Sequence, residues 1–274
     1  MPEFIDALTH HEFLRNALLA GMLASIACGI SGTYVVVKRI GYLAGGISHA
    51  VLGGIGGALY LGYDPMSGAL TAALVSAFLV GWVHLRSNQN EDTLISAIWA
   101  VGMAGGILFM SRTSGYNADL VSYLFGNILM VSRKELYYMA VADLGVMALV
   151  YTLYRPFLAV TFDEEHARLR GVRVDVIYMV LLMIVGLTVV LLIQIVGLIL
   201  IIALLALPAA IASQYARSLS RIMVLAVILG WFFSVCGLAI AYRPDFPAGA
   251  TIVMIAGLGY LLSTAFQAVR SRSA

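Results

Sequence analysis

The chain has 274 residues, of which 62% are hydrophobic and 11% charged, and its formal net charge is +2. Soluble domains carry about 25% charged and about 45–50% apolar residues, so this composition excludes an ordinary water-soluble globule. The small, scattered basic clusters also exclude a surface built to bind nucleic acid. About 20 apolar residues of helix cross a bilayer, so the length allows about nine spans.

Apolar runs bounded by charged residues predict one all-α, polytopic transmembrane helix bundle over residues 1–274. The segment before the first run lacks a basic region and a small-residue cleavage site, so a cleaved signal peptide is not expected there. A break at Val196-Gly197 separates the sixth and seventh runs, which can also be read as one broken helix, giving eight spans. The expected spans are 13–37, 47–62, 66–85, 93–110, 135–154, 175–195, 198–213, 222–242 and 249–268.

Basic residues are unevenly distributed between the loops on the two sides of the predicted bundle. The positive-inside rule places the richer side in the cytoplasm. This assignment predicts a protein of the cell membrane with its N-terminus outside and its C-terminus in the cytoplasm, in agreement with an odd number of spans. With eight spans the loop 214–221, which carries Arg217 and Arg221, would lie on the wrong side.

Two loops are long enough to form structure of their own. The outer segment 111–135 contains the apolar stretch 120–131, which is too short to cross and predicts a re-entrant or surface-lying helix. In the cytoplasmic segment 155–175, Asp163 can cap a helix, and Glu164 and Glu165 would lie at its positive end. Gly171 is placed to end it. We expect a short helix over about 163–171, either a solvated loop helix or a contact for a partner.

The chain shows no sign of its own energy source. No G-x-x-x-x-G-K-[ST] phosphate loop occurs, so ATP binding by that route, and hence an enzymatic ATPase role, is not expected. Asp143 is the one acidic residue in the middle of a predicted span, either as a proton or ion site or as a group hydrogen-bonded to neighbours. Cys28 and Cys236 lie in apolar runs and are expected to be buried as small hydrophobic residues.

His49 is the strongest candidate for binding chemistry. Helical spacing places it on one face with Gly46, Gly53 and Gly56 or Gly57. Imidazole is a good zinc ligand and is also used for other transition metals. The alternative is a histidine hydrogen-bonded to a neighbouring carbonyl in a close helix contact. Ser48 either joins the same path or bonds to its own helix.

The remaining histidines are weaker candidates. His10 and His11 precede Glu12 and would either sample metal at the outer surface or be solvated. His84, at the cytoplasmic end of the third span, is expected to pack at the interface. His166 belongs to the predicted cytoplasmic helix and would be solvated or at a protein contact.

Four stretches in order carry a family pattern: YVVVKRIGYLAGGISHAVLGG, VSYLFGNILMVS, VTFDEEHARLRGVRV, and QIVGLILIIALLALPAAIA with the later FPAGATIVM. Over nearly the whole chain the sequence resembles the permease family of zinc, manganese and iron ABC importers. The positions in register with the family's third segment are Phe162, Asp163, Ala167 and Gly171. Those in its C-terminal signature are Gln194, Gly197, Leu205, Pro208, Ala209, Ala210, Pro247, Gly249, Ala250 and Thr251.

The resemblance implies a permease that carries no covalently bound cofactor and moves divalent zinc, manganese or iron. It implies a homodimer with two cytoplasmic ATPase subunits, which bind the ATP, and an extracytoplasmic metal-binding protein. The helix at 163–171, with Glu164, Glu165 and Arg168, would be the coupling helix that docks on the ATPase.

The same resemblance assigns the metal path. His49 matches the histidine of the family's Gly-Asp-Ala-Leu-Ser-His-Ala pattern, and the family's aspartate corresponds to Gly45. A site built from an Asp–His pair per subunit would therefore lose its carboxylates, although two His49 side chains across a dimer axis remain.

Three other functions are compatible with the residues. The same scaffold could carry a chelated metal or a small organic cofactor, an interpretation favoured by Gly45 and the glycine-lined face. A secondary carrier or channel would need no ATPase. An intramembrane enzyme is disfavoured, because no paired Asp motif and no H-E-x-x-H motif are present.

Overall fold

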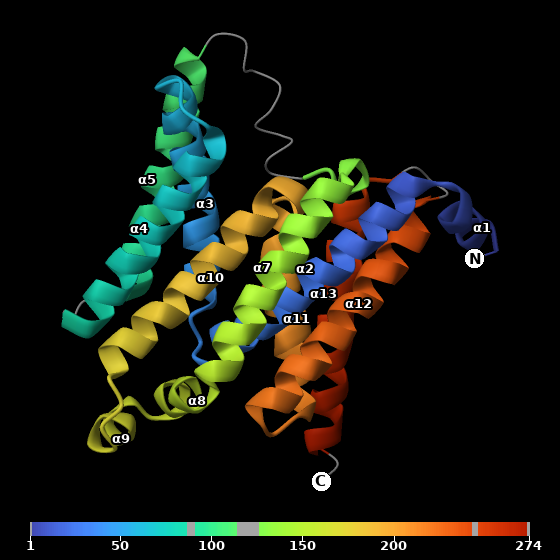
Figure 1. Ribbon diagram of the computed structural model, residues 1–274. Helices are drawn as coiled ribbons and strands as arrows, with labels where there is room; N and C mark the ends of the chain where they lie inside the picture. Colours follow the sequence, from blue (N-terminus) through green and yellow to red (C-terminus); the bar gives the residue numbers. More distant parts are fainter. Residues whose placement is uncertain (1, 87–90, 114–125, 243–245, 273–274) are drawn as a thin grey trace. The chain divides into compact units, whose positions relative to one another are not determined.

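The computed structural model describes residues 2–86, 91–113, 126–242 and 246–272, and it contains no strand within these ranges. The chain divides into two compact units (Figure 1). The first unit comprises residues 1–37, 124–147 and 194–274, and the second comprises residues 38–123 and 148–193. An all-helical fold is expected for a chain in lipid, because a helix satisfies its own backbone hydrogen bonds.

The first unit is built around three helices that cross at short distance. Helix α2 packs against α11 and α12, and α13 packs against the same two helices (Figure 1). A short 3-10 turn, η1, lies against α2. The elements are α1 (Pro2–His10), α2 (Glu12–Val37), η1 (Ile128–Met130), most of α7 (Arg133–Thr152), α11 (Leu198–Tyr215), α12 (Leu219–Tyr242) and α13 (Ala248–Arg272).

Glycines let the helices of the first unit approach to backbone contact. A β-carbon at Gly32 of α2 would overlap the carbonyl oxygen of Leu205 in α11. A β-carbon at Gly29 would lie 2.9 Å from the backbone nitrogen of Val227 in α12. Such small-residue crossings are how helices associate where lipid gives no hydrophobic driving force between them.

The second unit is centred on α3, which lies between α4 and α5 (Figure 1). Each contact is formed by facing glycines. Gly54 of α3 meets Gly68 of α4, while Gly53 and Gly56 meet Gly102 and Gly106 of α5. The elements are α3 (Gly41–Tyr60), α4 (Pro65–Arg86), α5 (Glu91–Arg112), α8 (Tyr154–Phe162), α9 (Glu164–Leu169) and most of α10 (Val174–Val196).

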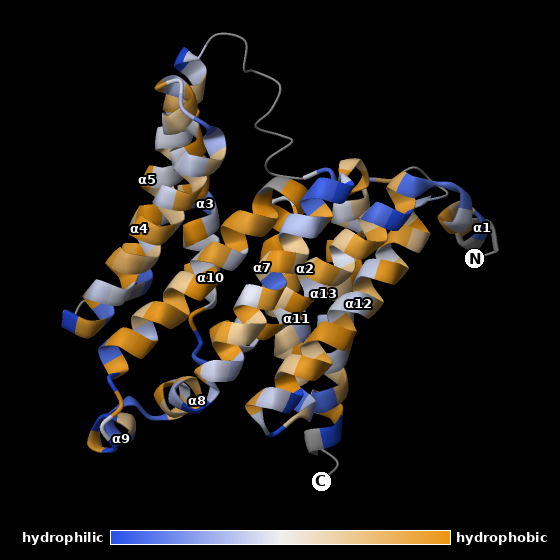
Figure 2. Cartoon of the chain, in the orientation of Figure 1, coloured by the Kyte–Doolittle hydropathy of each residue, from blue (hydrophilic) through white to orange (hydrophobic). Residues whose placement is uncertain are grey.

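The predicted spans agree with the helices. Within the described ranges, eight helices are long and apolar enough to cross a membrane, and α7 joined to α8 across a 72° bend makes a ninth. Their surfaces are largely hydrophobic, and hydrophilic residues gather at helix ends and connections (Figure 2). The predicted break between the sixth and seventh spans lies at Gly197, where φ is 86°.

Two local features differ from the prediction, and a third can be compared with it only in part. Helix α3 begins at Gly41, six residues before the predicted start at 47. The prediction followed the apolar run, whereas the helix also includes the Gly-rich turns that precede it. Helix α8 lies just ahead of the one short helix that was predicted in the cytoplasmic segment, over about 163–171. The first half of the apolar stretch 120–131 lies outside the described residues, and its described second half contains the 3-10 turn η1.

The crossing at Gly32 gives a stability prediction. Alanine normally favours a helix by about 1 kcal/mol over glycine, but at Gly32 its methyl group would overlap the Leu205 carbonyl. We expect Gly32→Ala to destabilise the detergent-purified protein by about 1–3 kcal/mol, the usual cost of overpacking, and to lower its apparent Tm.

The matched control is Gly257→Ala in α13, where a β-carbon would meet nothing within 4 Å. Its apparent Tm should be unchanged or raised. Equal Tm values for Gly32→Ala and wild type would contradict the close crossing.

Candidate functional site

His49 is held against an aromatic ring in the second unit. It lies midway along α3 and is 9% exposed. Its imidazole stacks on the indole of Trp99 in α5, with ring centroids 4.3 Å apart and planes inclined by 12°. Among the described residues, Nδ1 of His49 is buried without a hydrogen-bond partner. Nδ1 of His49 is therefore not hydrogen-bonded to a neighbouring carbonyl, the alternative considered from the sequence. This nitrogen remains available to a ligand.

Trp99 was not singled out from the sequence, and Gly45 explains its position. A β-carbon at Gly45, one turn before His49, would lie 3.3 Å from Cζ3 of Trp99. The absence of a side chain at 45 leaves the room that the indole occupies. A tryptophan four residues after a buried Ile95 gives no local sign that its partner is a histidine 50 positions earlier.

The glycine face of α3 is closed by α5. A β-carbon at Gly46 would lie 2.6 Å from Ile95, and one at Gly53 or Gly56 would lie 2.7 Å from a carbonyl oxygen of α5. Gly57 faces the ring of Phe109 at 3.8 Å. These glycines serve helix packing, so they do not leave a widened path on this face of α3.

Ser48 is fully buried and donates its hydroxyl hydrogen bond to the carbonyl oxygen of Ala44 at 2.7 Å. This is the self-bonded alternative considered for Ser48. An open groove is lined by residues of α3, α4 and α5 that include Ala50, which follows His49 in the chain, with Val75, Ser76 and Gly102. It contains no charged side chain, so it offers no further strong ligand for a cation.

The predicted cytoplasmic helix exists as α9, and its predicted cap and end are confirmed. The Oδ1 atom of Asp163 accepts a hydrogen bond from the backbone N–H of His166 at 2.8 Å. Gly171 follows the helix with φ 79°, a conformation that glycine adopts without strain. Ala167 is the buried contact of the helix, and Arg168 pairs with Asp175 at 2.6 Å.

The two acidic residues at the start of α9 differ in environment. Glu165 is exposed, and so is Phe162 just before the helix, at 65%. The carboxylate of Glu164 instead accepts a hydrogen bond from Nζ of Lys38 at 2.6 Å and lies 3.3 Å from Nε2 of His84. The hydrogen bond with His84 and the pairing with Lys38 outweigh the opposing effect of burial and lower the pKa of Glu164 to about 2.

The residues of the C-terminal signature belong to the first unit and shape its helices. Gly197 precedes α11 with φ 86°, and Pro208 is buried inside that helix. The carbonyl oxygen of Pro247 accepts the hydroxyl hydrogen bond of Thr251 at 3.0 Å across the first turn of α13, which also holds Gly249. The side chain of Gln194 lies outside the described part of the chain.

Among the described residues, the other histidine and acidic side chains do not gather into a metal centre. His10, His11 and His166 are exposed. Asp143 of α7 is 3% exposed, and its Oδ2 has no hydrogen-bond partner among the described residues. Over the described ranges no three His, Cys, Asp or Glu side chains group together.

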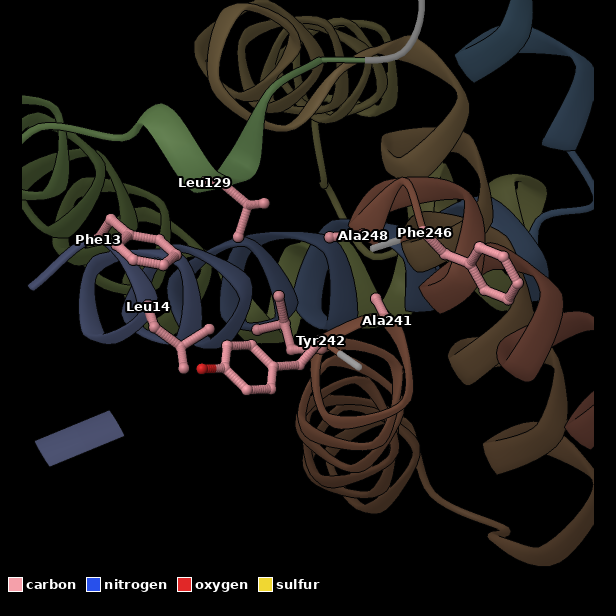
Figure 3. A pocket seen from close by; sticks show the side chains of 8 residues that line it. Phe13, Leu14, Leu129, Ala241, Tyr242, Phe246 and Ala248 are labelled. Atoms are coloured by element: carbon pink, nitrogen blue, oxygen red, sulfur yellow. The ribbon is translucent and has the colours of Figure 1, made fainter. Parts of the chain in front are cut away.

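An apolar groove of about 120 Å³ lies in the first unit between the ends of α2, α12 and α13 and the turn η1 (Figure 3). Leu14, Leu129 and Phe246 line it with Phe13, Leu238, Ala241, Tyr242 and Ala248. Because this lining carries no charged side chain, the groove cannot hold a bare cation.

Similarity to known proteins extends over nearly the whole chain. The sequence matches the ABC 3 transport family over residues 10–267. The chain belongs to this family. The family assignment agrees with the polytopic helical bundle and with the absence of a phosphate loop from the sequence.

Relatives within this similarity have names that describe metal transport. A probable metal transport system membrane protein of Chlamydia pneumoniae is 44% identical over 91% of this chain and 87% of its own length. The manganese transport system membrane protein MntC of Halalkalibacterium halodurans is 32% identical over 96% and 90%. The solved structure of PsaBC from Streptococcus pneumoniae in complex with Fab matches with a TM-score of 0.85 at 32% identity, covering 96% of this chain and 94% of that one.

The lowered pKa of Glu164 predicts a pH-dependent contribution to stability. Because the pKa falls from its ordinary value of 4.5 to about 2 on folding, Glu164 stabilises the protein above pH 4.5. This contribution is lost as the pH falls from 4.5 towards 2. In thermal unfolding in detergent, the apparent Tm of wild type should therefore be higher than that of Glu164→Gln near neutral pH. The difference between the two Tm values should narrow below pH 4.5.

Glu165→Gln is the matched control, since Glu165 is the exposed neighbour on the same helix. It should show little gap at any pH. A gap for Glu164→Gln that stayed constant down to about pH 3 would contradict the assigned ion pairing.

Proposed function

We propose that this chain is the permease subunit of an ATP-driven importer of divalent metal ions. The observation that carries the proposal is the family match over residues 10–267, supported by relatives named as metal and manganese transport proteins. The chain has spanning helices but no phosphate loop, so its energy would come from a separate ATPase subunit. A second copy of the chain and an extracytoplasmic metal-binding protein would complete the importer.

In this proposal α9 is the coupling helix that docks on the cytoplasmic ATPase. Exposed side chains on α9 and just before it suit such a contact: Glu165 and Leu169 of α9 are exposed, Leu169 at 87%, and Phe162 at the end of α8 is 65% exposed. Large exposed apolar side chains at the polar end of a membrane protein indicate a protein contact. The assignment places α9 and the C-terminus inside the cell and the N-terminus outside, as the basic loops predict.

His49 is proposed as the ion ligand in the path. Its buried Nδ1 without a partner among the described residues supports this role, and the second copy would supply the second imidazole. The names of the relatives and the chemistry of the imidazole ligand favour different divalent metal ions. The relatives' names favour manganese. Gly45 provides no carboxylate, so the imidazole of His49 is left as the ligand. Imidazole favours zinc or iron, whereas manganese prefers oxygen ligands.

Metal uptake by the assembled complex tests the proposal. The permease, purified with its ATPase, is reconstituted into vesicles and supplied with the metal-binding protein and manganese, zinc or iron. We expect uptake that requires ATP, with the three ions compared by competition. Uptake that persists without ATP would indicate a secondary carrier, and no uptake of any of the three would contradict the proposed cargo.

A substitution at His49 tests the ligand role separately from packing. His49→Phe keeps a ring that can stack on Trp99 but removes both nitrogens. We expect metal uptake to fall at least about tenfold, the effect of about 1.4 kcal/mol in an equilibrium constant, while the protein remains folded.

His10→Ala is the control, because His10 is exposed on α1. It should leave uptake unchanged. Full uptake by His49→Phe would instead favour a chelated metal or small cofactor, the cargo considered because Gly45 replaces an expected carboxylate.

A further inference from the structure

Five segments of the second unit converge on one partly buried ionic cluster. Nζ of Lys38 donates to Oε1 of Glu164 at 2.6 Å and to the carbonyl oxygen of Val160, at the end of α8, at 3.0 Å. Nε2 of His84, in the last turn of α4, lies 3.3 Å from Oε2 of Glu164. The ring of Tyr178 in α10 lies 4.8 Å from the Lys38 ammonium and 4.2 Å from the His84 ring.

Burial separates this cluster from an ordinary surface ion pair. The side chain of Lys38 is 9% exposed, and those of Glu164 and His84 are 28% and 23% exposed. The Arg168–Asp175 pair beside it is 54% and 61% exposed. Removing one partner of a buried pair leaves an uncompensated charge and is strongly destabilising. The partners of Glu164 should therefore move together with it.

The cluster also connects α9 with the segment of chain that leads into α3, the helix of His49. Lys38 is followed by Arg39, whose φ of 60° is unusual for a residue with a side chain. Helix α3 begins two residues later at Gly41 and carries His49. A displacement of the first turn of α9 thus reaches α3 through one ion pair and a short, conformationally restricted connection.

We infer that Lys38, His84 and Glu164 form the linkage that carries a displacement of α9 to α3, so that movement of the ATPase changes the position of His49. The inference rests on the proposed function, and it makes Glu164 a positioning residue that acts through Lys38. Glu165 then serves the outer surface of α9, and Glu164 serves its connection to the spanning helices.

Two readouts on the permease–ATPase complex in vesicles test the linkage. The first is the ratio of metal taken up to ATP hydrolysed. We expect Glu164→Gln and Lys38→Gln to hydrolyse ATP at no less than about half the wild-type rate while the ratio falls about tenfold or more. Asp175→Asn, which removes the exposed partner of Arg168, should keep the wild-type ratio. The exchanged pair Lys38→Glu with Glu164→Lys should recover part of it.

The second readout does not depend on metal. A fluorophore is attached through Tyr42→Cys, at the exposed start of α3, in a chain whose Cys28 and Cys236 are replaced by alanine. Trapping the ATPase with ATP and vanadate should change its emission in the otherwise wild-type complex. The change should be at least halved by Glu164→Gln and preserved in Asp175→Asn, which removes only the exposed pair with Arg168.

The outcomes separate the linkage from the proposed function. If wild type moves no metal but the Tyr42 probe responds to ATP and Glu164→Gln abolishes the response, the cargo is wrong and the linkage stands. An equal probe response in Glu164→Gln, or no response in wild type, overturns the linkage. Loss of ATPase binding by Glu164→Gln also overturns it, since Glu164 would then be a docking residue.

Discussion

The direct backbone contact of α3 with α4 and α5 is the constraint on which the second unit depends. Lipid provides no hydrophobic force between helices, so their association relies on close packing, and facing glycines provide it. Gly102 of α5 is close enough that its β-carbon would lie 3.0 Å from the carbonyl oxygen of His49. The same crossing therefore fixes the depth of His49 and brings Trp99 onto its ring. The position of His49 is therefore a consequence of helix packing.

The charge of Lys38 places a second constraint just before the start of α3. A lysine that is 9% exposed requires a partner, and Glu164 provides it. This requirement gives the six-residue helix α9 two faces, because Glu164 turns towards Lys38 while Glu165 is exposed. A helix this short is not stable through its own hydrogen bonds. Its orientation therefore depends on the Asp163 cap, the buried Ala167 and the ion pair.

Local patterns predicted the spans and the cap of α9, because apolar run length and Asp163 act within a few residues of themselves. They did not predict the partners of His49 and Glu164. Trp99 lies 50 positions from His49, and Lys38 lies 126 positions from Glu164, so nothing in the neighbouring residues indicates either contact. Helix α8 was not predicted, although Pro156 lies in its first turn, where a proline is tolerated.

Gly45 connects these constraints to the choice of ion. Cζ3 of Trp99 lies 3.3 Å from the position of a β-carbon at 45, so a carboxylate side chain there would need the indole to shift slightly. The described part of the chain thus offers one imidazole at this depth and no group of three ligands. Zinc takes four ligands and manganese favours oxygen donors, so one imidazole cannot complete either shell. If His49 holds the ion, the remaining ligands must come from water, backbone carbonyls or the second copy, and the site would bind weakly enough to release its cargo.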